Sequence, residues 1–127
     1  MHQQNPQKNP LSQARGKQGE LLARKHLQNN GYSIIESNWR GRWAEIDIIA
    51  VHADTLVIVE VKTRHSHEHG LPEESITPHK LRILERSALL YKQEHPELPD
   101  VLRIDFIGID FTEGITPRIN LIKNISS

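Results

Sequence analysis

The stretch EIDIIAVHADTLVIVEVK, residues 45–62, decides the fold of this chain. It contains two runs rich in isoleucine and valine, Glu45–Val51 and Thr55–Lys62, separated by the short polar stretch 52–54. β-Branched residues favour strands, and a short polar connection between two strands predicts an antiparallel hairpin. Both runs are apolar on their two faces, which is typical of strands covered by helices on both sides. The stretch therefore predicts a hairpin at the centre of a mixed α/β sheet.

The segments on either side of the hairpin predict two helices and three further strands. Residues 11–30 are expected to form a helix that Asn30 and Gly31 end, because glycine commonly follows the last helical turn. A second helix is expected to begin with Thr77 as its cap and Pro78 in its first turn, and to end near residue 94. The further strands are predicted at Tyr32–Asn38, Val101–Ile109 and Arg118–Lys123. The order α-β-β-β-α-β indicates an α/β fold with a mixed central sheet flanked by helices.

The composition limits the class of protein. The 127 residues fit one compact domain, which we expect over residues 11–127. Residues 1–10 are polar, contain two prolines and are predicted to form a disordered tail. No apolar run exceeds four residues and no signal-peptide pattern is present, so we expect no membrane span and a cytoplasmic location. The absence of cysteine excludes disulfides, thiolate metal sites and cysteine nucleophiles.

Charge is balanced over the whole chain, with 16 basic and 16 acidic residues, but it is unevenly distributed. Residues 1–44 carry seven lysines and arginines and two glutamates, whereas residues 45–61 carry four carboxylates and no basic side chain. An acidic segment that follows a basic one suits a protein that attracts a polyanion and holds a cation. Scattered, solvated charges would give similar numbers, so this pattern alone decides nothing.

The hairpin is expected to bring acidic side chains together. With a turn at residues 53 and 54, opposed residues have numbers that sum to 107. This register places Asp47 opposite Glu60, with their Cβ atoms about 4.5–5.5 Å apart. It also places Glu45 opposite Lys62, which lies on the same face as Glu60. The sequence therefore predicts two carboxylates side by side with a lysine next to them.

Two adjacent carboxylates repel each other unless a cation lies between them, and Mg²⁺ or Mn²⁺ is a natural partner. Such an ion polarises a phosphoryl oxygen and activates water. Lys62 could orient that water or stabilise charge in the transition state. We therefore interpret Lys62, Asp47 and Glu60 as catalytic residues. The alternative is a hairpin in which Lys62 pairs with Glu45 and Glu60 and only stabilises the fold, although charges inside strands this apolar are costly.

A third acidic side chain is expected from the first helix. Gly16, Glu20, Ala23 and Leu27 share one face of that helix through three- and four-residue spacing. Glu20 then points along a small, apolar face, where it could complete a metal site directly or through water. A carboxylate that simply reaches solvent at the edge of the helix is the alternative.

These residues resemble a known catalytic signature. Asp47, followed thirteen positions later by Glu60-Val61-Lys62, is similar to the PD-(D/E)xK motif of restriction-endonuclease-like nucleases. A wider set of segments over about residues 13–110 resembles the YraN-like proteins, a largely uncharacterised bacterial family that itself resembles Holliday-junction resolvases. The segments are Gly16–Glu20, Asn38–Arg40, Glu45–Ala50, Val59–Arg64, Lys80 with Ala88 and Tyr91, and Arg103–Phe106.

The resemblance implies a restriction-endonuclease-like core with one metal site. The implied metal ligands, or residues that support them, are Glu20, Asp47, Glu60 and the carbonyl of Val61. Lys62 is implied to be the catalytic lysine. The chain departs from the family at Ala44, where glycine is usual, and alanine there would be strained if the backbone required a positive φ.

Basic and aromatic residues near these motifs are candidates for contact with DNA. Arg40, Arg64 and Lys80 are expected to bind phosphates, which positions a nucleic acid without selecting its sequence. Trp39 and Trp43 could stack on exposed bases, although in a chain with few aromatic residues at least one is expected in the core.

Together these observations predict a metal-dependent DNA endonuclease that hydrolyses phosphodiester bonds. By analogy with the resembled resolvases, branched or otherwise structured DNA is the expected substrate. A resolvase needs two sites, so a homodimer is plausible. Two alternatives remain, a nuclease-fold DNA-binding module whose site is idle, and a protein-interaction adaptor in DNA uptake, repair or recombination.

Overall fold

The computed structural model of the protein describes residues 10–112 and 114–126, with side chains from residue 13 onwards. The predicted tail at residues 1–10 lies outside the described residues except for Pro10, which begins the first helix. The elements are α1 (Pro10–Asn29), β1 (Tyr32–Arg40), β2 (Glu45–His52), β3 (Thr55–Arg64), the short 3₁₀ helix η1 (Pro72–Ser75), α2 (Pro78–Glu94), β4 (Val101–Asp110) and β5 (Arg118–Ile122). The predicted order of helices and strands is confirmed.

The two α-helices begin and end at the residues that the sequence marks. Gly31, directly after α1, has φ +87°, and its amide donates a 3.2 Å hydrogen bond to the carbonyl of Gln28. At the start of α2, the Thr77 side chain accepts a hydrogen bond from the amide of Lys80, 3.2 Å long, and Pro78 lies in the first turn. No helix in the described ranges is long and apolar enough to cross a membrane.

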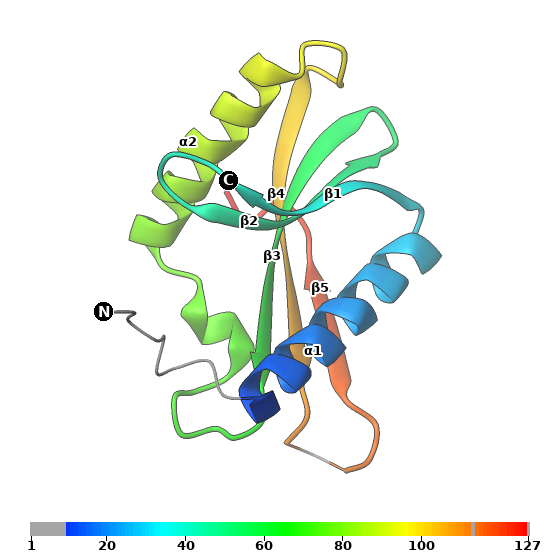
Figure 1. Cartoon of the computed structure of the whole chain (residues 1–127), viewed down its shortest axis with the longest axis vertical. Helices are drawn as coiled ribbons and strands as arrows, with labels where there is room; N and C mark the ends of the chain where they lie inside the picture. The colour runs from blue at the N-terminus through cyan, green and yellow to red at the C-terminus, as the bar shows by residue number, and fades with distance from the viewer. Residues whose placement is uncertain (1–9, 113, 127) are drawn as a thin grey trace, which may run out of the picture.

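The strands form one five-stranded mixed sheet in the order β1-β2-β3-β4-β5. β3 and β4 run parallel, whereas the other neighbouring strands run antiparallel. Parallel neighbours need a crossover connection, and α2 lies in the connection between β3 and β4. Figure 1 shows α1 and α2 on opposite sides of the sheet. The α/β fold with a mixed sheet flanked by helices is therefore confirmed.

Successive side chains of the central strands point to opposite faces of the sheet, and the helices bury both of these faces. On the α1 side, the core includes Ala23, Leu27, Val57 and Val59. On the α2 side, it includes Leu56, Ile58, Leu84, Ala88 and Tyr91. Burial of each large apolar side chain contributes about 1.5–3 kcal/mol to stability. Coverage of both faces explains why the central strands are apolar at nearly every position.

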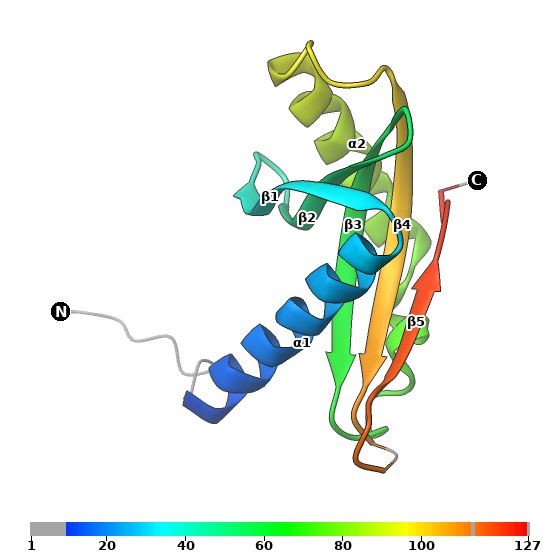
Figure 2. The same cartoon turned by 90° about the vertical axis from the view of Figure 1, so that its right-hand side faces the viewer.

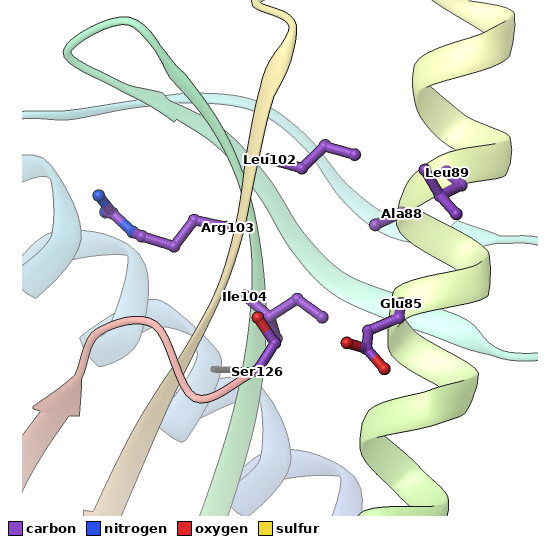
Figure 3. A pocket seen from close by; sticks show the side chains of 7 residues that line it. All are labelled: Glu85, Ala88, Leu89, Leu102, Arg103, Ile104 and Ser126. Atoms are coloured by element: carbon purple, nitrogen blue, oxygen red, sulfur yellow. The ribbon is translucent and has the colours of Figure 1, made fainter.

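A cavity of about 240 Å³ lies between α2 and β4. Ala88 and Leu89 line it from the helix, and Leu102 and Ile104 line it from the strand (Figure 3). Near the end of the chain, Ser126 also reaches its wall. None of the predicted site residues lines this cavity, so it is separate from the candidate site.

The hairpin of β2 and β3 keeps the predicted register over only part of its length. Opposed residues sum to 107 from His52 opposite Thr55 to Ile48 opposite Val59. The β2–β3 ladder ends at that last pair, although both strands continue. β2 stays paired with β1 to its first residue. The two central strands therefore separate, and a gap opens between them.

This separation corrects two predicted pairs. Asp47 does not oppose Glu60 in the ladder, and Glu45 does not oppose Lys62. Glu45 is paired instead with Arg40 of β1. Beyond Ile48, β2 continues alongside β1 and no longer pairs with β3. β1 carries an irregularity in its register, and such irregularities bend a strand pair.

A buried polar network joins distant parts of the chain on the α1 side of the sheet. The Asp105 carboxylate is fully buried, and it accepts hydrogen bonds from the Tyr32 hydroxyl at 2.6 Å and from Arg103 at 2.8 and 2.9 Å. The amide of Asn124 donates a further hydrogen bond of 2.9 Å. Arg103 and Asp105 thus form a structural pair, and the network ties β1 and β4 to the C-terminal segment.

We expect Asp105→Ala to lower the free energy of unfolding by about 3–5 kcal/mol, because the Arg103 guanidinium and the Tyr32 hydroxyl lose their acceptor. Urea denaturation followed by circular dichroism measures this. Asp100→Ala is the control, since Asp100 is 97% exposed in its ion pair with Lys92 and should contribute at most about 0.5 kcal/mol. Equal losses in the two variants would contradict a stabilising role for the network.

Candidate active site between β2 and β3

Asp47 lies where β2 leaves β3. Its Oδ2 atom accepts a hydrogen bond from the backbone amide of Val61 across the gap, with an N–O distance of 2.8 Å. Val61 lies two residues beyond Val59, the last residue of β3 in the ladder with β2. A carboxylate thus satisfies an amide that a continued ladder would have paired with a backbone carbonyl. The side chain links the two strands across the gap.

Glu60 lies close to Asp47 at this gap. Burial and then repulsion from the Glu60 carboxylate raise the pKa of Asp47 to about 7, while the hydrogen bond from Val61 opposes that shift. The side chain of Glu60 is only 17% exposed, and its Oε2 atom lies 3.3 Å from the ammonium of Lys80 in the first turn of α2. The two acidic side chains therefore do come together, through the separation of the strands and not through the ladder pair that the register predicted.

α1 forms the wall of a cavity of about 360 Å³ at the gap. The residues that line it are Gly16, Glu20, Asp47, Val61, Lys62 and Thr63. The helix approaches β3 this closely because residue 19 is glycine, since a Cβ atom there would collide with the side chain of Thr63. Gly19 thereby places its neighbour Glu20 at the cavity wall.

Asn38 of β1 holds Glu20 in this position. The Asn38 side-chain amide donates a hydrogen bond of 3.1 Å to Oε1 of Glu20. Asn38 has φ +55°, a left-handed conformation that asparagine adopts more readily than most residues. The sequence prediction assigned no role to Asn38. Its signals were an asparagine at the end of a predicted strand, where this residue is uncommon, and its place in the Asn38–Arg40 segment of the family resemblance.

Lys62 is the basic side chain in the cavity. Its ammonium forms no ion pair or hydrogen bond with the residues that the structure describes. The alternative in which Lys62 pairs with Glu45 and Glu60 is therefore not what the structure shows. Glu45 lies 3.5 Å from Arg40, and Glu60 contacts Lys80. Lys62 faces the cavity with its charge unneutralised by a direct partner.

The gap offers oxygen donors that suit a divalent cation. The N–H and C=O of one strand residue point to the same side, so the Val61 carbonyl faces the gap as its amide does. With Asp47 and Glu60, this carbonyl supplies the hard oxygen ligands that Mg²⁺ prefers. A cation there would relieve the repulsion between the two acids. Among the described residues, no three acidic or histidine side chains already form a metal site, so Glu20 stands apart from the pair.

The three basic residues expected to bind DNA lie in different surroundings. Arg40 is 87% exposed beside Glu45. Lys80 reaches the site, but its ammonium contacts Glu60. Arg64, at the end of β3, is half-buried, and its Nε atom has no hydrogen-bond partner in the part of the chain that the structure describes. The fold therefore brings Lys80 to the carboxylates and leaves Arg40 at the surface.

Ala44 is accommodated without backbone strain. The described non-glycine residues with positive φ are Asn38, Ala53 and Asn124, so Ala44 does not adopt the conformation that would require glycine. Its carbonyl accepts a hydrogen bond of 3.0 Å from the amide of Gly41, which closes the turn between β1 and β2. The alanine at this position therefore fits the entrance to the site.

We expect Asp47→Asn to stabilise the protein in EDTA at pH 8. The folded chain raises the pKa of Asp47 from 3.8 to about 7, so stability falls as the pH rises between these values and stays low above them. The amide removes that cost while it can still accept the Val61 hydrogen bond, so the free energy of unfolding should increase by about 1–3 kcal/mol at pH 8 and little at pH 4. Urea denaturation at both pH values, with Asp100→Asn as the control, measures this. A loss of stability at both pH values would contradict it.

Comparison with known proteins places this site in a family. The sequence model of the uncharacterised protein family UPF0102 matches residues 19–109. A UPF0102 protein of Clavibacter michiganensis subsp. michiganensis is 39% identical over 109 residues, which cover 86% of this chain and 92% of the relative. A UPF0102 protein of Dehalococcoides mccartyi is 43% identical over 86% of this chain and 89% of its own length. The family match includes Asp47, Glu60, Val61 and Lys62 of the β2–β3 gap, and the chain belongs to the uncharacterised protein family UPF0102.

Proposed function

We propose that this protein is a divalent-metal-dependent phosphodiesterase that cuts DNA. The observation that carries the proposal is the pair of carboxyl groups at the β2–β3 gap, with an unpaired lysine in the adjoining cavity. A raised pKa at a cleft residue, caused by burial and a neighbouring acid, is typical of functional sites. A purely structural pair of acids would gain stability from a basic partner for each acid. Among the described residues, Asp47 accepts a hydrogen bond from the amide of Val61 and lies beside the carboxyl of Glu60, and it forms no ion pair with a basic side chain.

The residues at the gap have distinct roles in the proposed reaction. Asp47, Glu60 and the Val61 carbonyl would hold Mg²⁺ or Mn²⁺, which when bound supplies Lewis-acid activation of phosphate and water. Lys62 donates hydrogen bonds to the phosphate or to the attacking water, and its positive charge stabilises the charge that develops on phosphate oxygens. Glu20, held by Asn38, orients water at the cavity wall.

Basic side chains around the gap would hold the phosphate backbone. Arg64 has a buried Nε atom without a hydrogen-bond partner, which a phosphate oxygen would satisfy. Arg40 is solvent-accessible, and Lys80 could move from Glu60 to a phosphate when a cation takes its place. By analogy we propose branched or structured DNA as the substrate, and a homodimer that would present two sites to opposed strands.

The ion pair between Lys80 and Glu60 favours a second candidate function. The Lys80 ammonium neutralises the Glu60 carboxylate without a metal, as expected of a site that has no catalytic activity. In that case the fold acts as a DNA-binding module or as an adaptor in DNA uptake, repair or recombination. A binding module keeps salt-sensitive affinity for DNA when Asp47 is replaced, whereas an adaptor binds no DNA.

We expect the wild-type protein to cut DNA with Mg²⁺ or Mn²⁺, and Lys62→Ala to lower kcat by about 10²–10³-fold while metal binding is retained. A cleavage screen of linear, flapped and four-way DNA measures this, with titration calorimetry for the metal. Asp47→Ala should lose both cleavage and metal binding. Lys25→Ala, which changes an exposed lysine of α1, is the matched control and should cut normally. Undiminished cleavage by Lys62→Ala would remove this lysine from the mechanism.

We expect Glu60→Gln to strengthen DNA binding in EDTA by about 1 kcal/mol, roughly fivefold, because it removes a repelling charge and releases Lys80 from its ion pair. Fluorescence anisotropy with labelled DNA measures the change. Glu94→Gln alters an exposed glutamate at the end of α2 and controls for net charge. Weaker binding by Glu60→Gln would mean that Glu60 lies away from the phosphate path.

A further inference from the structure

The turn between β1 and β2 is fixed to the core of the protein. The amide of Gly41 donates to the carbonyl of Ala44, and Gly41 packs so closely on the ring of Trp39 that a Cβ atom would collide with it. Trp39 in turn packs edge-to-face on Tyr91 of α2, with ring centres 5.3 Å apart. Figure 2 shows the turn projecting from the sheet. Its side chains are therefore presented to solvent on a rigid support.

The two tryptophans of the chain lie in opposite environments. Trp39 is half-buried against the α2 core, whereas Trp43, in the turn, is 45% exposed. Among the described residues with large exposed apolar side chains, Trp43 is the only aromatic one. An exposed tryptophan ring offers a flat face on which an aromatic ligand group can stack. The expectation that at least one tryptophan belongs to the core is met by Trp39, and Trp43 remains available to a ligand.

One arginine lies against the exposed ring, and a second lies at the base of the same turn. The Arg42 guanidinium carbon lies 5.8 Å from the centre of the Trp43 ring, and Arg40 is largely exposed at the base of the turn. An aromatic ring beside arginines is suited to bind a nucleotide. The ring can stack on the base, and the guanidinium groups can bind the phosphates of the nucleic-acid backbone. An apolar protein surface would instead desolvate these cations without compensation.

We infer that Trp43 stacks on an unpaired base of the DNA, with Arg40 and Arg42 on the adjoining phosphates. Trp43 precedes Asp47 by four residues, which corresponds to at most about 14 Å along an extended chain. At a rise of about 3.4 Å per nucleotide, this distance spans at most about four nucleotides of a stacked strand. Bases inside a continuous duplex are stacked on each other and unavailable. The substrate class is therefore DNA with unpaired nucleotides a few positions from the cut, an inference that rests on the proposed function for the position of the cut.

Tryptophan fluorescence tests the stacking without any cleavage. In Trp39→Phe, Trp43 is the sole tryptophan, and we expect a single-stranded oligothymidine in EDTA to quench its emission. In Trp43→Phe, which leaves the core untouched, the same oligonucleotide should leave the emission of Trp39 unchanged. Trp43→Ala should weaken binding of single-stranded and forked DNA by about 5–150-fold in fluorescence anisotropy, and binding of a fully paired duplex by less than about twofold.

Leu89→Ala is the matched control, because it removes an apolar side chain that is 58% exposed on α2 and should not change the affinity. Equal weakening for single strands and duplex, or no weakening, would overturn the inference. So would a Trp43 emission that responds to anionic lipid vesicles and not to DNA. If DNA is cut in the presence of Mg²⁺ but the emission of Trp43 does not change when DNA binds, the stacking inference is wrong and the nuclease proposal stands. Quenching of Trp43 by DNA that is never cut would support the stacking and refute the nuclease.

Discussion

The hydrogen bond from the Val61 amide to the Asp47 carboxylate spans the gap between β2 and β3, and the candidate site depends on that contact. A continued ladder would pair backbone with backbone and leave no space between the strands. The carboxylate satisfies one amide while the strands separate, so the Val61 carbonyl is directed into the same space. This arrangement holds Asp47 close to Glu60 in a buried position, which raises its pKa. Such a cost in stability is typical of a site shaped by function.

Each element around the gap contributes one part of the site. Gly19 allows α1 to contact β3, and the helix therefore supplies Glu20 at the cavity wall. The Thr77 cap begins α2 where its first turn can direct Lys80 towards Glu60. Lys80 and Lys62 differ in their surroundings. α2 places Lys80 against Glu60, whereas Lys62 extends from β3 into the cavity. Lys80 thus balances part of the negative charge of the carboxyl pair, whereas Lys62 forms no ion pair with the described residues.

Much of the fold follows from local sequence patterns. Helix ends were predictable because Gly31 and Thr77 act through their own backbone and side chains. The strand positions and the hairpin register near its turn follow from β-branched runs and a two-residue connection. Asp47 and Glu60 were predicted to be neighbours from the hairpin register, and they were singled out because charges inside apolar strands are costly. The structure brings them together although that ladder pair does not form. Short-range interactions thus account for the elements and for the choice of acidic residues.

The sequence by itself determined which residues could form a site, since Asp47, Glu60, Val61 and Lys62 all belong to two adjacent strands. Only the tertiary structure decided how they meet. β2 stays paired with β1 as far as Glu45, whereas its ladder with β3 ends at Ile48, and the register irregularity of β1 bends the β1–β2 pair. The contact of Asn38 with Glu20, and the burial of Trp39 while Trp43 stays exposed, depend likewise on surfaces distant in the chain. No local pattern encodes these outcomes, because each depends on what a neighbouring element places against the residue.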